Sequence, residues 1–185
     1  MASPTIHLAI AKKYLEKKKS INYKKFIAGT LYPDAVDDNN KSHYTDVNRG
    51  NDNVSHVRGK VNLYDFLIEH ESLSDFELGW FLHLVTDYLF FEKCFSTEYL
   101  LNNSYETFCK DLYFAYDCLN TYIPKKYHIT KNDYADYPSE YYPGIPYEDC
   151  ILSKNMIDEF ISYVSSVDIY EYIKKIRKSK KNVKP

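Results

Sequence analysis

The sequence predicts a single all-α domain of about six or seven helices spanning residues 1–185. In most segments, apolar residues recur at the three- and four-residue spacing of a helix face. Only five of the 185 residues are glycine, too few for a sheet sandwich with its many turns. A chain of this length suits one domain and can bury about two thirds of its unfolded surface.

Two helices are expected at the start of the chain. Ser3 is the expected cap of the first helix, and Pro4 lies in its first turn. The apolar side of this helix is formed by Ile6, Leu8, Ala9, Ala11 and Leu15. The second helix is expected from Tyr23 to about Leu31, ending before Pro33, because the residue before a proline avoids the helical region.

A long polar segment follows, from Asp34 to Gly59, and it lacks apolar periodicity. Such a loop is unusual in a compact domain unless it is disordered or functional. A short helix is then expected from Leu63 to His70.

The central helix is expected from Ser74 to about Phe95. Ser74 and Glu77 have the spacing of a capping box, which predicts where the helix begins. The helix is apolar nearly all round, so it should be the most buried of the fold.

The rest of the chain predicts a helix from Tyr105 to Tyr122 and two closing helices at about 154–166 and 168–180. Between them, residues 123–150 are rich in Tyr and Pro and predict an irregular stretch.

The charge is unevenly distributed along the chain. The formal net charge is −2, yet residues 174–185 hold seven Lys or Arg and no acid, which leaves 17 basic and 26 acidic residues elsewhere. An acidic body speaks against nucleic acid as the main partner and is compatible with cation binding. We interpret the basic tail as a frayed helix end; contact with anionic lipid or nucleic acid is the alternative.

The four cysteines are Cys94, Cys109, Cys118 and Cys150, and none forms a C-x-x-C pair. We interpret them as reduced thiols. The chain shows neither an export signal nor an uninterrupted apolar run of the roughly 18 residues that span a membrane. The expected location is therefore cytoplasmic.

The central helix carries two polar groups on one face, His83 and Asp87. Positions i and i+4 project from the same side of a helix, so the imidazole and the carboxylate can point at one spot. An ionised carboxylate in a buried apolar run is costly unless it is paired or bound to a metal. A buried His–Asp hydrogen bond between helices is the simpler alternative.

Three further residues could join this pair. His7 lies on the apolar side of the first helix, Asp34 follows Pro33, and His43 lies in the long loop. Taken singly, they read as a core histidine, a helix cap and a solvated loop residue. Taken together with His83 and Asp87, three imidazoles and two carboxylates suit Zn²⁺, Fe, Mn²⁺ or Ni²⁺ better than Ca²⁺ or Mg²⁺.

Other polar residues of the long loop are candidates for binding substrate. His56 lies in the same loop as His43 and could be a substrate contact or the true loop ligand. Arg49 and Arg58 could hold a phosphate oxygen. No glycine-rich phosphate loop and no G-x-S-x-G elbow is present.

Four segments follow one another in this order: T-I-H-L, F-I-A-G-T-L-Y-P-D-A-V, S-H-Y and L-G-W-F-L-H-L-V-T-D-Y. Together they resemble the zinc-dependent phospholipase C family, in particular its small, uncharacterised bacterial members. The resemblance covers roughly residues 3–95. It implies an all-α domain with a cluster of up to three zinc ions that cleaves phosphodiesters.

The resemblance also implies a ligand set. One metal would be held by four residues, namely Asp34, His43, His83 and Asp87, and a second would be shared by Asp87 and His7. In the family a free, processed amino terminus is a further ligand of that second metal. Here Met1 to Pro4 precede the first helix, so a water or another side chain would have to complete the site.

The family's third metal needs two histidines and a glutamate downstream, and after Asp87 this chain has only His128. The third site is therefore expected to be absent. Glu92 or Glu98 could supply an oxygen ligand.

We therefore expect a metal-dependent phosphodiesterase or other phosphoester hydrolase with one or two zinc ions. A metal-activated water would attack the phosphorus, and Asp34 would orient or deprotonate that water. The substrate would be a phosphodiester or a phosphorylated small molecule. Two alternatives stay open: a non-catalytic binding protein stapled by a metal, and a binding protein that acts through the Tyr-rich 123–150 segment.

Overall fold

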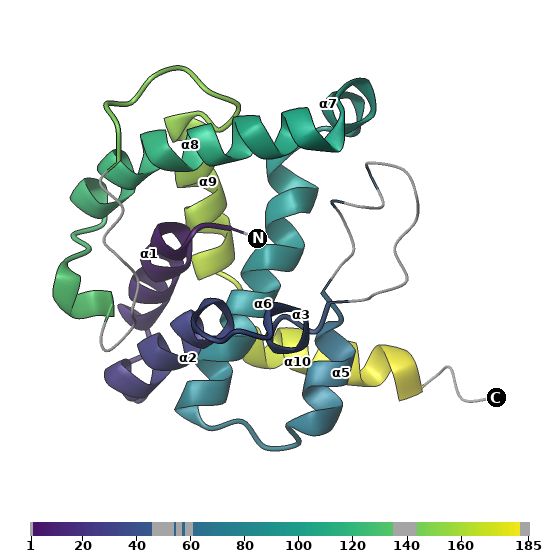
Figure 1. Ribbon diagram of the computed structural model, residues 1–185. Coiled ribbons are helices and arrows are strands. Elements are labelled where there is room, and N and C mark those ends of the chain that lie inside the picture. Colours follow the sequence, from purple (N-terminus) through teal and green to yellow (C-terminus); the bar gives the residue numbers. More distant parts are fainter. Residues whose placement is uncertain (1, 46–53, 55–56, 58–60, 135–143, 182–185) are drawn as a thin grey trace.

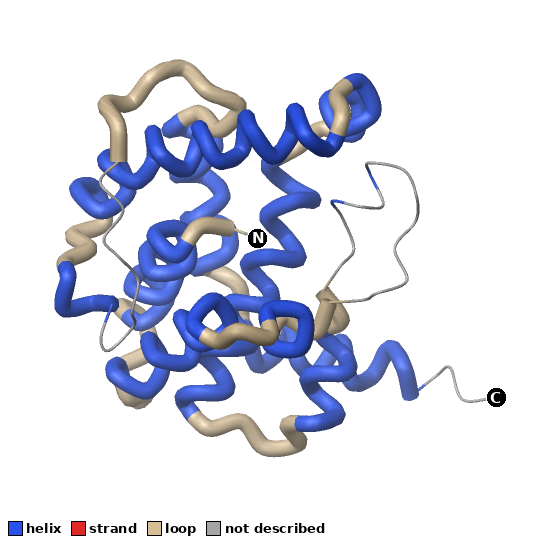
Figure 2. The backbone as a smooth tube through the Cα atoms, in the orientation of Figure 1, coloured by secondary structure: helices blue, strands red, loops and turns tan. Residues whose placement is uncertain are grey.

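The computed structural model describes residues 2–45, 54, 57, 61–134 and 144–181. Within these ranges the chain forms nine α-helices, one 3-10 helix and no strand, apart from an isolated bridge between Thr45 and Val61 (Figure 2). The predicted all-α class is confirmed. None of the described helices is both long enough and apolar enough to cross a bilayer.

The helices are α1 (Pro4–Leu15), α2 (Tyr23–Ala35), α3 (Asn39–Ser42), α5 (Leu63–Glu69), α6 (Asp75–Cys94), α7 (Thr97–Asn102), α8 (Tyr105–Lys126), α9 (Lys154–Ser165) and α10 (Ile169–Lys181), with the 3-10 helix η1 at Lys131–Tyr134. The count exceeds the expected six or seven because α3 and α7 are short helices of four and six residues. α3 lies inside the segment expected to be an irregular loop.

The starts of the helices follow the predicted caps, with one exception. At α6, Ser74 Oγ accepts from the Glu77 amide and the Glu77 carboxylate accepts from the Ser74 amide, so the capping box is present. At α1, Ser3 does not cap through its side chain. Its hydroxyl instead bonds the Thr5 hydroxyl at 2.9 Å.

The end of α2 corrects the sequence prediction. The helix does not stop before Pro33 but continues through it to Ala35. Pro33 lies in the last turn, where a missing N–H removes only one helical hydrogen bond. As a result, Asp34 is held on the last turn of a helix, one turn after Thr30, and does not lie in a loop.

Helix α8 is also longer than expected, since it continues through Pro124 to Lys126. The first residues of the segment predicted to be irregular, 123–150, are therefore helical. Residues 144–150 are irregular as expected, and residues 135–143 lie outside the described part of the chain.

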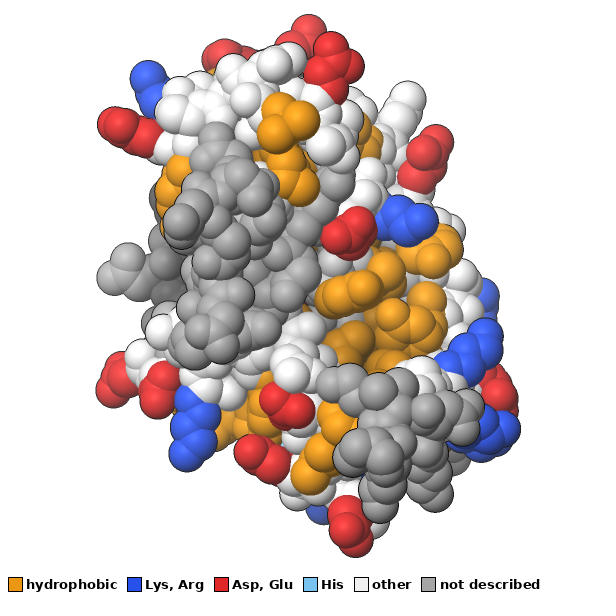
Figure 3. Space-filling view, turned by 90° about the vertical axis from the view of Figure 1, so that its right-hand side faces the viewer, with side chains coloured by type: hydrophobic (Ala, Val, Ile, Leu, Met, Phe, Trp, Pro, Cys, Tyr) orange, Lys and Arg blue, Asp and Glu red, His pale blue; other side chains and the backbone are white. Residues whose placement is uncertain are grey.

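Helix α6 forms the axis of the fold. In Figure 1 it runs through the middle of the molecule, with α8 across its upper end and the chain start beside its middle. It packs against α2, α9, α1 and α5 and buries residues on every side. On the face shown in Figure 3, hydrophobic side chains gather between charged ones.

The crossing of α2 and α6 is a contact between two backbones. A Cβ on Gly29 would lie 1.8 Å from the carbonyl oxygen of Phe76, and a Cβ on Gly79 would lie 2.0 Å from that of Phe26. Neither position has room for a methyl group. The two glycines therefore set how closely the helices approach, one turn away from His83 on α6.

Because no flexible side chain can give way at this crossing, we expect Gly79→Ala to destabilise the protein by about 3 kcal/mol or more. Chemical denaturation followed by circular dichroism would measure the loss. Lys24→Ala, an exposed change on α2, is the control and should stay within about 0.5 kcal/mol of the wild type. A Gly79→Ala protein as stable as this control would show that the helices can separate at no cost.

Candidate metal centre

The centre is built on α6. His83 and Asp87 follow one another by one turn and are both buried, with side-chain exposures of 0% and 1%. The His83 Nε2 atom lies 3.2 Å from Asp87 Oδ2. The i, i+4 geometry expected from the sequence is therefore present, and both side chains are buried in the core.

Two other segments bring ligand atoms to the same point. The last turn of α2 places Asp34 Oδ1 3.2 Å from His43 Nε2 and 3.9 Å from His83 Nε2. His43 follows α3 and is buried rather than solvated. Its Nε2 lies 3.0 Å from His83 Nε2 and 3.6 Å from Asp87 Oδ2.

These five separations, from 3.0 to 3.9 Å, have a simple geometric meaning. Ligand atoms about 2.0 Å from a tetrahedral metal ion lie roughly 3.3 Å from one another. Five of the six pairs among these four ligand atoms, all except the pair of Asp34 and Asp87, thus stand about as far apart as the ligands of one such ion.

The histidines are oriented by hydrogen bonds on their other ring nitrogens. His83 Nδ1 lies 2.8 Å from the carbonyl oxygen of Thr30, which can only accept, so Nδ1 carries the proton. The Ser42 hydroxyl donates to the Pro33 carbonyl and therefore accepts from His43 Nδ1 at 3.2 Å. Such outer hydrogen bonds are typical of metal-binding histidines.

As a consequence, when neither Nε2 atom carries a proton, the two imidazoles point Nε2 lone pairs at each other across 3.0 Å. Two acceptors at this distance repel unless a cation or a proton lies between them. The arrangement therefore favours an ion at the point where the ligand atoms converge.

A second group of ligands lies on the other side of Asp87. His7 Nε2 of α1 lies 3.3 Å from Asp87 Oδ1, and the His7 ring stacks on His83 with centroids 3.7 Å apart. The Ala2 amide donates to the same Oδ1 at 2.7 Å. Asp87 thus presents one oxygen to each of two groups that could hold a metal ion, His7–His83–Asp87 and Asp34–His43–His83.

Several polar atoms of this cluster are buried without a hydrogen-bond partner among the described residues. They are both ring nitrogens of His7, Asp34 Oδ2 and Asp87 Oδ2. An unpaired buried polar atom is costly, and here four of them occur within one cluster. A bound cation, together with its water, would satisfy them.

Burial and charge shift the pKa values of the cluster in opposite directions. Burial alone would raise the pKa of Asp87, but His83 and His7 hold it well below its ordinary value. Burial, with His83 nearby, lowers the pKa of His7. For His83 the neighbouring Asp34 and Asp87 outweigh burial and raise the pKa. In the absence of a metal, a proton on His83 compensates the two carboxylates.

The structure brings together His7, Asp34, His43, His83 and Asp87. His56, Arg49 and Arg58 lie outside the described residues, so their predicted substrate contacts stay predictions.

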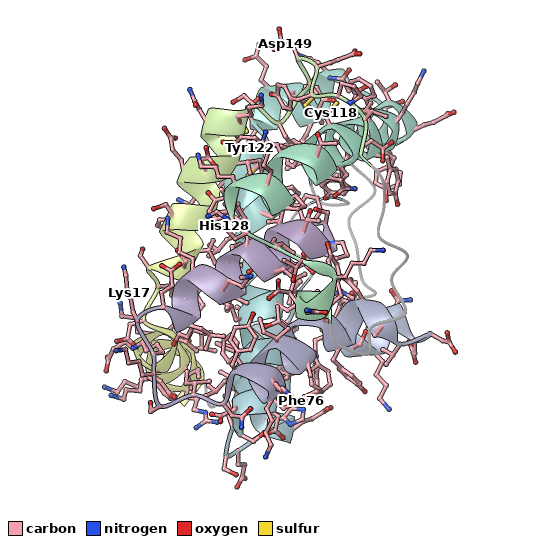
Figure 4. All side chains as sticks on the ribbon, turned by 90° about the vertical axis from the view of Figure 1, so that its left-hand side faces the viewer. Lys17, Phe76, Cys118, Tyr122, His128 and Asp149 are labelled. Atoms are coloured by element: carbon pink, nitrogen blue, oxygen red, sulfur yellow. The ribbon has the colours of Figure 1, made fainter. Side chains whose placement is uncertain are left out.

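The other candidate ligands do not reach the cluster. His128 is exposed and lies just beyond the end of α8, past Tyr122 (Figure 4). Glu92 and Glu98 are exposed as well. The remaining histidine, His70, is not a candidate, and its Nδ1 lies 3.1 Å from the Glu77 carboxylate.

Sequence reasoning missed the atoms that orient the ligands, which belong to Ala2, Thr30 and Ser42. Two of these contacts use backbone atoms, which carry no signal in the residue type. The polar residue next to His43, Ser42, was the one visible hint.

No family model, curated protein or solved structure matches this chain.

Removing the charge of Asp87 should abolish metal binding. Asp87→Asn keeps an acceptor for the Ala2 amide, but a neutral amide is a much weaker ligand. Zinc at about 100 times its dissociation constant should raise the melting temperature of the wild type by roughly 5 to 10 °C and that of the variant hardly at all. The single tryptophan, Trp80, donates to the Ser42 carbonyl beside His43 and offers a fluorescence signal.

The control for this experiment is Asp37→Asn, an exposed carboxylate a few residues past Asp34. It should respond to zinc like the wild type. Equal metal content and equal chelator response in the Asp87→Asn and wild-type proteins would exclude Asp87 as a ligand.

The pH dependence of stability should reverse when metal is added. In metal-free protein the pKa of His7 is lowered, so this residue costs stability as the pH falls below the ordinary histidine pKa of 6.5. The pKa of His83 is raised, so its stabilising proton is lost as the pH rises through that raised value. The melting temperature should therefore peak near pH 6.5. With excess zinc, the ion replaces that proton, so the melting temperature should keep rising above this pH.

Thermal melts between about pH 5.5 and 8, with chelator and with zinc, would test this expectation. Parallel curves under the two conditions would mean that metal and proton do not compete for the cluster.

Proposed function

We propose that the protein is a metal-dependent hydrolase of phosphoesters, with phosphodiesters as the expected substrates. The observation that carries the proposal is that His43 and His83 lie close to each other and to both carboxylates, Asp34 and Asp87, with one oxygen of each carboxylate left without a hydrogen-bond partner among the described residues. A purely structural His–Asp pair would need neither the second carboxylate nor the second histidine.

Zinc is the ion that this donor set suits best. Imidazole nitrogen and carboxylate oxygen at tetrahedral spacing are zinc ligands, whereas Ca²⁺ and Mg²⁺ take more oxygen atoms in larger shells. Fe, Mn²⁺ and Ni²⁺ accept the same donors. The two oxygens of Asp87, one facing each ligand group, support a pair of ions sharing this carboxylate.

When bound, the metal would lower the pKa of a coordinated water from about 16 towards 7 and so supply hydroxide at neutral pH. Among the ligands, Asp34 is placed to handle that water. Its side chain is 12% exposed, against 0 or 1% for the other four. Its Oδ1 faces His43, while its Oδ2 is available to accept a hydrogen bond from the water.

The resemblance to the zinc-dependent phospholipase C family supports the same reaction class. The residues matched by that resemblance, His7, Asp34, His43, His83 and Asp87, are those that the fold assembles. A third metal is not part of the proposal, because His128 is exposed and lies beyond the end of α8.

A metal-stapled binding protein is the competing function, and one observation favours it. Four of the five ligands are at most 1% exposed, as in a closed structural site. A catalytic metal keeps an open coordination position, whereas a staple does not. The two functions therefore differ in whether the loaded protein turns over a substrate.

Zinc-loaded protein should hydrolyse bis(4-nitrophenyl) phosphate, and Asp34→Asn should lower the rate per bound zinc by about 100-fold or more. The amide preserves the shape of Asp34 but cannot take the proton of a water. Release of 4-nitrophenolate, together with the zinc content of each sample, measures this ratio. Asp37→Asn is the matched control and should retain the wild-type rate.

If the protein binds zinc and is stabilised by it, but hydrolyses neither phosphodiesters nor phosphomonoesters, the metal-stapled binding protein is the favoured function. Turnover that is unaffected by Asp34→Asn would keep a hydrolase but remove Asp34 from the reaction.

A further inference from the structure

His43 is the ligand with the least local support. The other four ligands lie on helices of 12 to 20 residues, whereas His43 follows α3, a helix of only four residues. A single helical turn is not stable by itself. The next residue, Tyr44, has a φ of 48°, in the left-handed region that residues other than glycine rarely adopt. Contacts with the rest of the fold must therefore hold His43 in place.

Trp80 of α6 supplies one such contact. Its indole Nε1 donates to the carbonyl oxygen of Ser42 at 2.8 Å, and this carbonyl belongs to the peptide bond that leads into His43. Trp80 also lies three residues before His83, which places both side chains on one side of α6. The hydrogen bond thus joins the segment of one ligand to the helix of another, and the Nε2 atoms of these two ligands lie 3.0 Å apart.

The indole ring is itself held in one orientation. It packs edge-on against four rings, those of Tyr32, Phe66, His70 and Phe76, with centroids 4.6, 5.3, 5.3 and 6.4 Å away. These rings come from α2, from α5 and the residue after it, and from α6. A ring packed in this way gives its N–H a fixed direction, and an indole has only this one donor. The hydrogen bond to Ser42 is therefore preorganised.

We propose that Trp80 is a positioning residue of the metal centre: through the Ser42 carbonyl it keeps His43 Nε2 at ligand distance from the ligands of α6. Without the indole N–H the segment of His43 would be less restrained, and this ligand would bind the metal more weakly. The inference rests on the metal centre of the proposed function, and it holds whether the loaded centre is catalytic or structural.

A role of Trp80 in packing alone has different consequences. An indole N–H inside a protein needs an acceptor, and a tryptophan that only fills space can use any carbonyl. Its loss then lowers the stability of the fold with and without metal. A positioning role instead lowers the affinity for zinc, and only while His43 is present to be positioned.

Trp80→Phe keeps an aromatic ring and removes the N–H. It should weaken zinc binding about 10- to 100-fold, as is typical for the loss of a group that orients a metal ligand. Competition with a chromogenic chelator measures the affinity, on protein shown to be folded by circular dichroism. Tyr32→Phe is the matched control, because it removes a polar group from a ring packed against Trp80 and leaves the hydrogen bond to Ser42 in place. It should bind zinc like the wild type.

The same substitution in a His43→Ala background separates positioning from packing. His43→Ala should bind zinc more weakly, through the remaining ligands. If Trp80 acts through His43, adding Trp80→Phe to this variant should change the zinc affinity by less than about 2-fold. An equal loss of affinity in both backgrounds would show that Trp80→Phe loosens the centre as a whole.

A second measurement leaves Trp80 unchanged and so does not depend on the folding of Trp80→Phe. Trp80 is the single tryptophan of the chain, so its indole N–H gives one signal in a ¹H–¹⁵N spectrum. If the hydrogen bond to Ser42 strengthens zinc binding, zinc must strengthen that hydrogen bond by the same factor. Zinc should therefore slow exchange of the indole proton with D₂O about 10- to 100-fold in the wild type, and should not slow it in His43→Ala.

The inference is overturned if the wild type binds no zinc, if Trp80→Phe binds zinc as tightly as Tyr32→Phe, or if zinc leaves the exchange of the indole proton unchanged. It is supported if the loss of affinity and the slowed exchange both require His43. Failure of the proposed function gives a different result: zinc binding that depends on Trp80, in a protein that hydrolyses no phosphoester.

Discussion

The constraint on which the structure depends is the burial of a charged carboxylate in the middle of its central helix. Asp87 is 1% exposed and contacts His7, His83, His43 and the Ala2 amide. A buried charge is tolerated only when it is paired and hydrogen-bonded. Two segments that reach it from outside α6, namely α1 with its leading residues and the residue after α3, therefore contribute groups that stabilise this charge.

The helix crossing makes this possible. Gly29 and Gly79 let α2 and α6 approach until backbone touches backbone. At that distance the carbonyl of Thr30 reaches His83, and the last turn of α2 carries Asp34 over the centre. Larger side chains at the crossing would move α2 outwards, and Asp34 would then be too far away to share an ion with α6.

The centre is asymmetric in a way that bears on chemistry. His7, His83 and Asp87 are sealed in the core, while Asp34 alone has partial access to solvent.

The sequence by itself determined the all-α class, the capping box that starts α6, and the pairing of His83 with Asp87, because these depend on local spacing along one helix. It did not determine the end of α2, where the packing of α2 on α6 outweighs the tendency of Pro33 to end a helix. Nor could it show that His43 is buried or that the Ala2, Thr30 and Ser42 atoms orient the ligands.

Those features depend on contacts between residues as many as 85 positions apart, and on backbone atoms that every residue type shares. Periodicity assigns a side chain to a face of its helix, whereas only the packing of the helices decides which faces meet. The convergence of five ligands from α1, α2, α6 and the residue after α3 was therefore decided by the tertiary structure.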